Sequence, residues 1–153
     1  MLTRLDTALS PVGMAAFLTG AVEPWVRERA QDRFASEGDD VVGSWAPLQP
    51  ATVDVRSRGE WAIGGEHPIN KRTGELENYI TKSNGKAWPH ALGATLTYPG
   101  KPSGKKSIVE KMKTAQTGRS HPRTVARPVL GLNERDLLHV LTSLAFYVKG
   151  SKA

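Results

Sequence analysis

Residues 133–148 read NERDLLHVLTSLAFYV, and this stretch predicts the clearest helix of the chain. Its large apolar residues recur every three or four positions, the spacing that places side chains on one face of an α-helix. Asn133 stands at the N-cap position, where its side chain accepts hydrogen bonds from the first turn. Glu134 and Asp136 follow at the positive end of the helix dipole. We therefore expect a C-terminal helix that buries one apolar stripe, formed by Leu137, Leu141, Leu144 and Val148.

A second long helix is expected nearer the N-terminus. From Val12 to Phe34, apolar residues recur at helical spacing and give the segment one apolar and one basic edge. Pro24 either kinks this helix or lies in the first turn of its second half, where a missing N–H costs little. Gly38 is expected to end it.

Shorter elements are expected between these two helices. Thr52 is placed to cap a helix through about Arg58, and Thr73 to cap another, TGELENYI. Strands are expected around residues 87–98, where ALGATLTY tolerates β structure. The fold class is therefore α+β, with long N-terminal and C-terminal helices packed on a small antiparallel sheet.

Length and composition favour one globular domain over residues 1–153, because 39% of the residues are hydrophobic. The absence of cysteine excludes disulfides and thiolate metal sites. Met1 to Ser10 contains Arg4 and Asp6 and lacks the apolar core of a secretory signal. The nearly apolar run from Pro11 to Val22 is too short for a membrane span of about 20 residues, so we expect no membrane insertion.

The positive charge of the chain is concentrated in one segment. Net charge is +6, and residues 101–127 alone carry +7. We expect residues 99–127 to form a basic loop or arm that faces DNA or an acidic partner, because clustered cations gain counterion-release free energy on phosphates. A solvated, flexible loop without a partner is the alternative. The residues expected to face the partner are Lys101, Lys105, Lys106, Lys111, Lys113, Arg119 and Arg123.

The sequence contains no pattern that predicts an enzyme or a cofactor. No phosphate-binding loop, dinucleotide fingerprint or nucleophile elbow occurs. His67, His90, His121 and His139 are far apart in the sequence and lack metal-ligand spacing, so we expect no metal site. The acidic pairs 39–40 and 75–77 could hold magnesium for a nuclease, but each also fits a place next to a helix end.

Four segments, in order, resemble the phage virion morphogenesis or tail-completion family of head–tail joining (neck) proteins. The first is FASEGDDVVGSWAPLQPAT, with the pattern F-x-x-E, glycine and W-x-P-L before a threonine-led helix. The second is the T-G-x-L turn in RTGELENYI, and the third is AQTG, with Ala115 where the family has histidine. The fourth, TVARPVLGLNERD, is similar to the family's P-x-R-P-F-L-G-L-S-x-x-D, with Val125 and Val129 as departures.

The resemblance covers roughly residues 12–148, and the order of the motifs is more specific than any one of them. It implies a non-enzymatic structural protein of a tailed phage, part of the head–tail junction or a tail-terminating ring. The ring, of six copies, would contact adjacent connector and tail proteins and pass DNA non-specifically. The implied location is the virion, after assembly in the host cytoplasm. The motif residues are Trp45, Leu48, Thr73, Gly74, Leu76, Gln116, Gly118, Arg127, Pro128, Leu130 and Gly131.

Two other functions stay open at this point. A sequence-independent nucleic-acid-binding protein is favoured by the basic segment, although that segment contains no Phe, Trp or Tyr on which bases could stack. A nuclease acting during DNA packaging would require the acidic pair Asp39 and Asp40 to bind magnesium.

Overall fold

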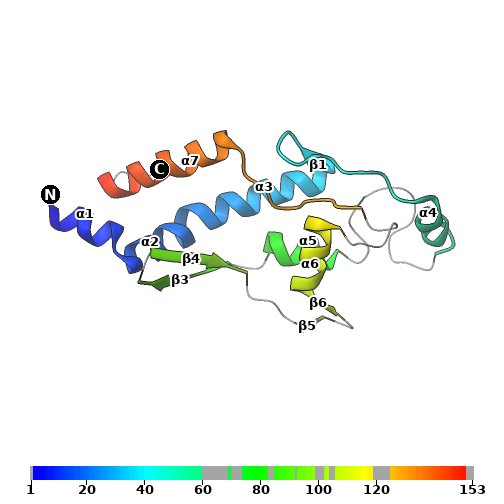
Figure 1. Cartoon of the computed structure of the whole chain (residues 1–153), viewed down its shortest axis with the longest axis horizontal. Helices are drawn as coiled ribbons and strands as arrows, with labels where there is room; N and C mark the ends of the chain where they lie inside the picture. Colours follow the sequence, from blue (N-terminus) through cyan, green and yellow to red (C-terminus); the bar gives the residue numbers. More distant parts are fainter. Residues whose placement is uncertain are drawn as a thin grey trace. The chain divides into compact units, whose positions relative to one another are not determined.

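Helices and short antiparallel strand pairs together give the protein an α+β fold, which confirms the expected fold class (Figure 1). In the computed structural model the expected single domain is built as two compact units. The hairpin unit comprises Met1–Arg27, Asn84–Pro99 and Leu132–Ala153, and the core unit comprises Glu28–Ser83 and Gly100–Gly131. The structure describes residues 2–59, 69, 74–82, 85–91, 93–98, 102–103, 106–118 and 125–150.

The N-terminal part of the hairpin unit is helical almost throughout. Helix α1 (Leu2–Leu9) was not anticipated, and Ser10 ends it and caps α2 (Pro11–Phe17) by accepting a hydrogen bond from the N–H of Gly13. A π-helical turn, η1 (Leu18–Val22), continues into α3 (Glu23–Ser36). The predicted helix over 12–34 is thus confirmed, with one π turn inside it. Pro24 is the second residue of α3, directly after the π turn, so a residue without an N–H lies where the regular α-helical bonding is already interrupted.

The segment predicted to contain strands forms a β-hairpin. Strands β3 (Lys86–His90) and β4 (Gly93–Thr97) are antiparallel, with Ala87 opposite Leu96. Helix α2 and η1 lie against this hairpin. Figure 1 shows the hairpin on one side of α2 and the C-terminal helix on the other.

The C-terminal helix α7 (Glu134–Lys149) begins and ends as its sequence predicts. Asn133 and Asp136 form a reciprocal capping box, and Gly150 closes the helix in the left-handed conformation. The prediction that its apolar stripe is buried is wrong for Leu137 and Leu141, which are 52% and 61% exposed, whereas Leu144 and Val148 are partly buried. The more buried side of α7 carries Tyr147 together with Leu144 and Val148.

Two aromatic contacts hold α7. The Tyr147 ring lies 5.4 Å from the Phe17 ring, and its hydroxyl donates to the carbonyl of Gly13. The His139 ring stacks on Trp25 at 5.1 Å. His139 and Tyr147 are separated from Leu141 by more than a quarter turn of the helix, so Leu141 is directed away from the contacts with Phe17 and Trp25.

The core unit begins with the end of α3 and a tight turn. The helix is ended by Glu37, the residue that takes up the left-handed conformation (φ 56°), rather than by Gly38. Strands β1 (Gly38–Asp39) and β2 (Gly43–Ser44) then pair. Helix α4 (Pro50–Ser57) follows, and its N-cap position is Gln49. The expected cap, Thr52, lies inside the first turn, because proline at the first helical position lets the helix start earlier.

The remaining elements of the core unit are α5 (Glu75–Lys82), strands β5 (Pro102–Ser103) and β6 (Lys106–Ser107), and α6 (Ile108–Thr117). The prediction of a basic loop over 99–127 is wrong for α6, which packs on α5. Its Ala115 is buried, because apolar residues on one face of α6 contribute to the core despite the surrounding lysines. Thr73, the expected cap of α5, lies outside the described residues.

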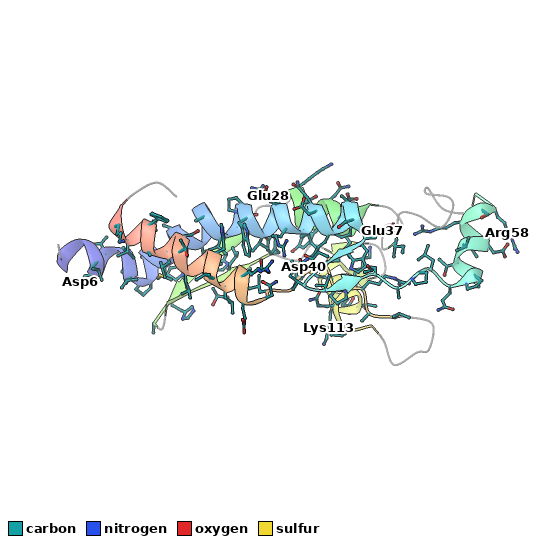
Figure 2. The ribbon with its side chains drawn as sticks, turned by 90° about the horizontal axis from the view of Figure 1, so that it is seen from above. Asp6, Glu28, Glu37, Asp40, Arg58 and Lys113 are labelled. Atoms are coloured by element: carbon teal, nitrogen blue, oxygen red, sulfur yellow. The ribbon has the colours of Figure 1, made fainter. Side chains whose placement is uncertain are left out.

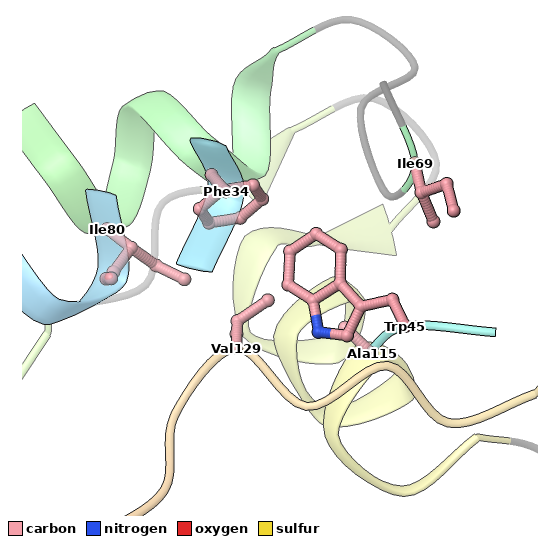
Figure 3. Close-up of a cluster of buried hydrophobic side chains, with 7 residues drawn as sticks. Phe34, Trp45, Ile69, Ile80, Ala115 and Val129 are labelled. Atoms are coloured by element: carbon pink, nitrogen blue, oxygen red, sulfur yellow. The ribbon is translucent and has the colours of Figure 1, made fainter. Parts of the chain in front are cut away.

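The core of this unit joins residues far apart in sequence. Figure 3 shows the indole of Trp45 among Phe34, Ile69 and Val129. The Phe34 and Trp45 rings meet edge to face at 5.4 Å, a favoured aromatic geometry. The buried apolar cluster is Ala30, Phe34, Trp45, Ile69, Ile80, Ala115 and Val129.

Candidate functional site

The segments that carry the resemblance meet inside the core unit through side chains bonded to backbone. Trp45 donates its indole N–H to the carbonyl of Pro128 at 2.9 Å. In the opposite direction, the Arg127 guanidinium donates to the carbonyls of Ala46 (2.8 Å) and Pro47 (2.9 Å). Three hydrogen bonds therefore join the W-x-P-L segment and the R-P-V-L segment, one donated by Trp45 and two donated by Arg127.

Gln116 joins a third segment to the same region through hydrogen bonds of its side chain. Its side-chain Oε1 accepts from the N–H groups of Val129 (3.0 Å) and Leu130 (3.1 Å), and its Nε2 donates to the carbonyl of Leu130. The N–H of Arg127 also donates to the carbonyl of Ala115. The side-chain amide carries both a donor and an acceptor. It can therefore bond the N–H and C=O groups of an extended backbone, as a neighbouring strand would.

A buried ion pair closes this arrangement. Arg33, whose side chain is 2% exposed, donates to the Asp39 carboxylate at 2.6 Å and to the carbonyl of Gly131 at 2.8 Å. Asp39 also accepts from the N–H groups of Val41 and Val42. Burial acts to raise the pKa of Asp39, but these hydrogen bonds outweigh it and hold that pKa below its ordinary value.

Sequence reasoning missed the pairing of Arg33 with Asp39. Arg33 had been placed on the basic edge of a helix, and Asp39 in an acidic turn that could hold a magnesium ion. The structure uses the Asp39 oxygens for two arginines, Arg33 and Arg29, and for two backbone N–H groups. An arginine six residues before an aspartate, across a helix end, was the available signal.

The two motif glycines near helix ends have left-handed backbones. Gly74 (φ 71°) precedes α5, and Gly118 (φ 68°) follows α6. Gly131 is constrained by space instead, since a Cβ there would lie 2.9 Å from a methyl of Val42. Leu48, Leu76 and Leu130 pack against the core. All motif residues that the structure describes therefore belong to the one unit.

The basic residues expected to face a partner are not gathered into one site by the described residues. Lys111 pairs with Glu75 at 2.5 Å. Lys113 is exposed on α6 (Figure 2). Lys106 belongs to β6, and its side chain lies outside what the structure describes, as do Lys101, Lys105, Arg119 and Arg123.

Two further features bear on chemistry. Within the described ranges, no group of three or more His, Asp, Glu or Cys side chains lies close enough to hold a metal ion. No helix in the part of the chain that the structure describes is long and apolar enough to cross a membrane.

The hairpin unit contains a candidate contact surface. Helices α1 and α7 lie side by side, and a groove of about 580 Å³ opens between them. Its lining is nearly all aliphatic, with Lys149 at one edge. Exposed aliphatic surface of this kind marks sites of association. The apolar lining residues are Leu5, Leu9, Leu141, Leu144, Ala145 and Val148.

No protein-family model, no curated protein and no solved structure matches this chain.

Proposed function

We propose that the protein is a non-enzymatic structural subunit of a tailed-phage particle, located at the head–tail junction or in the ring that terminates the tail. The observation that carries the proposal is the convergence of the resembling segments. Trp45, Gln116 and Arg127 come from three separate motifs, and their side chains bond the three segments to one another.

The arrangement is suited to a rigid building block. Its polar side chains are occupied by backbone groups, as the bonds of Arg33, Gln116 and Arg127 show. Side chains used in this way define one backbone conformation, which a subunit needs when it repeats around a ring. We propose a closed ring of six copies, with adjacent connector and tail proteins as neighbours.

DNA passing through the ring is the second proposed partner. Exposed cations such as Lys113 allow phosphates to pass without base recognition. A sequence-independent nucleic-acid-binding protein is the alternative function. It would bind duplex DNA on its own, with an affinity that falls steeply as salt rises.

The test is the place of the protein in the particle. Particles of the phage or prophage whose genome encodes this chain are purified, and the protein is located by antibody labelling and by cryo-electron microscopy. We expect it at the neck or upper tail, in a copy number that follows the local symmetry. Absence from the particle, or a location away from the neck and tail, would overturn the proposal.

Trp45→Ala provides the functional arm of that test. It should leave tails or heads unjoined, because the W-x-P-L segment loses its indole contact with Phe34 and its bond to Pro128. Trp88→Ala is the matched control, since Trp88 is 58% exposed on the hairpin. Normal particles with the Trp45 variant, at normal protein level, would contradict the proposed role of the interlocked motifs.

A further inference from the structure

We infer that the α1–α7 face of the hairpin unit binds a second copy of the chain, with the two α7 helices antiparallel across a twofold axis. This inference does not rest on the proposed function. Two helices side by side form one layer of a bundle, and an identical layer placed against it completes a four-helix bundle with an apolar centre. The groove between α1 and α7 is where the opposing helix would lie.

The spacing of the apolar residues along α7 fits a helix partner, with two of them exposed and two partly buried. Leu137, Leu141, Leu144 and Val148 follow one another in steps of four, three and four. This alternation keeps a seam of apolar side chains facing a neighbouring helix over successive turns. Within the hairpin unit, α1 lies beside the C-terminal part of this seam, yet Leu137 and Leu141 stay more than half exposed and a groove remains open between the two helices.

The charges at the two ends of α7 favour a second copy of the chain as the partner, with its α7 helix antiparallel. Glu134 is exposed in the first turn and Lys149 in the last turn, and both flank the apolar seam. In an antiparallel pair, Leu137 of one copy is level with Val148 of the other, and each Glu134 comes within reach of the other copy's Lys149. A parallel pair would instead bring like charges together, which is unfavourable, as are parallel helix dipoles.

The twofold contact differs from the contacts of a ring. A twofold axis reverses the second copy, whereas a closed ring is made by head-to-tail contacts. The inferred dimer therefore describes the free protein in solution. Its contact is small, near or below about 1,200 Å², so it should dissociate on dilution.

Cysteine crosslinking tests the direction of the helices, because the chain has no cysteine of its own. Two full-length single variants are prepared, Leu137→Cys and Val148→Cys. In an antiparallel pair the two different cysteines are level, whereas like cysteines lie about 16 Å apart along the axis. We expect a disulfide-linked dimer when the two variants are mixed and oxidised, and none from either variant alone.

The other crosslinking results would overturn the inference. Crosslinking of each variant with itself, when it is oxidised alone, would mean a parallel pair. No crosslinking in any sample, with both variants folded by circular dichroism, would mean that this face does not bind a second copy. Thr142→Cys mixed with Leu137→Cys is the control for random collision, because position 142 faces away from the seam.

Charge exchange tests the pairing of the ends by analytical ultracentrifugation. Glu134→Lys alone and Lys149→Glu alone should each weaken dimerisation by about tenfold, since like charges then meet at both ends, each at a cost of several tenths of a kcal/mol. An equimolar mixture of the two should recover wild-type affinity, because every end pair is again opposite in sign. A wild-type chain that is monomeric at ~100 μM, or single variants that dimerise like wild type, would refute the inference.

Discussion

The core unit and the hairpin unit use their apolar residues in different ways. In the core unit, Trp45, Ile80 and Val129 are almost completely buried, and Arg33 and Gln116 bond the surrounding backbone. In the hairpin unit, Phe17 is buried, but Leu137 and Leu141 on α7 face water. The first unit satisfies its own apolar and polar groups, while the second leaves an apolar seam for another molecule. An amphipathic pattern therefore identifies the apolar face of a helix, but it does not identify which element or molecule covers that face.

Aspartate substitutions should show the largest difference in stability between the two units. Val129→Asp should unfold the core unit, at a cost above about 4 kcal/mol, because the site is fully buried and a carboxylate there has no partner. Leu141→Asp should change the stability of the monomer by only about 0.5 kcal/mol, since Leu141 is 61% exposed. Both are measured by denaturant titration.

The Leu141 variant gives the more informative test, because helix α7 is present whether its leucine stripe is buried or exposed. Burial of the leucine stripe, as expected from the sequence, would make Leu141→Asp insoluble or unfolded. The titration is run dilute enough to keep the wild type monomeric. Unfolding of the Leu141 variant under those conditions would show that the seam is covered within the chain.

Removal of the buried arginine has the next largest effect. Arg33→Ala should lower the free energy of unfolding by about 3–5 kcal/mol, because Asp39 loses the nearer of its two arginines and the carbonyl of Gly131 loses its donor. Arg58→Ala breaks an exposed pair with Asp54, so a loss below about 1 kcal/mol is expected. Equal losses for the two arginines would show that the Arg33 pair is no more important than a surface contact.

The indole hydrogen bond gives a smaller effect. Trp45→Phe keeps an aromatic ring next to Phe34 but leaves the carbonyl of Pro128 without its donor, for a loss of about 1–3 kcal/mol. Trp88→Phe is the control, because its indole bond to Thr97 is exposed and water can replace it. Thermal unfolding of both variants, with equal shifts in Tm, would contradict the difference between the two sites.

The smallest expected effect is on the stability of the protein in acid. The pKa of Asp39 is held below its ordinary value in the folded chain, so the carboxylate contributes stability that is complete above the unfolded pKa. That contribution is lost as the pH falls through the lower, folded pKa. Asp39→Asn should therefore remove part of the decline in stability seen in acid, while Asp40→Asn, at an exposed position, should not. Parallel acid titrations of the two variants would refute this assignment.

Much of the core unit could be predicted residue by residue. Large apolar residues next to a proline or on one helix face commonly pack inward, and in the structure Trp45 is buried while Leu48 and Leu76 pack against the core. The role of Gln116 could not be worked out from its type. Its amide bonds to Val129 and Leu130, thirteen and fourteen residues further along, and only the folded chain brings them together.

The sequence by itself determined the local features of this protein. Asn133 and Gly150 set the ends of α7, Ser10 begins α2, and glycine permits the left-handed turn at Gly74, because caps and backbone conformations depend on neighbours within a few residues. The tertiary structure alone decided that Arg33 is buried against Asp39 and that α7 contacts Trp25 and Phe17 through His139 and Tyr147 while Leu137 and Leu141 stay exposed. The reason is physical: helical periodicity fixes which side chains share a face, but the free energy of burying that face is gained equally against the same chain or against another.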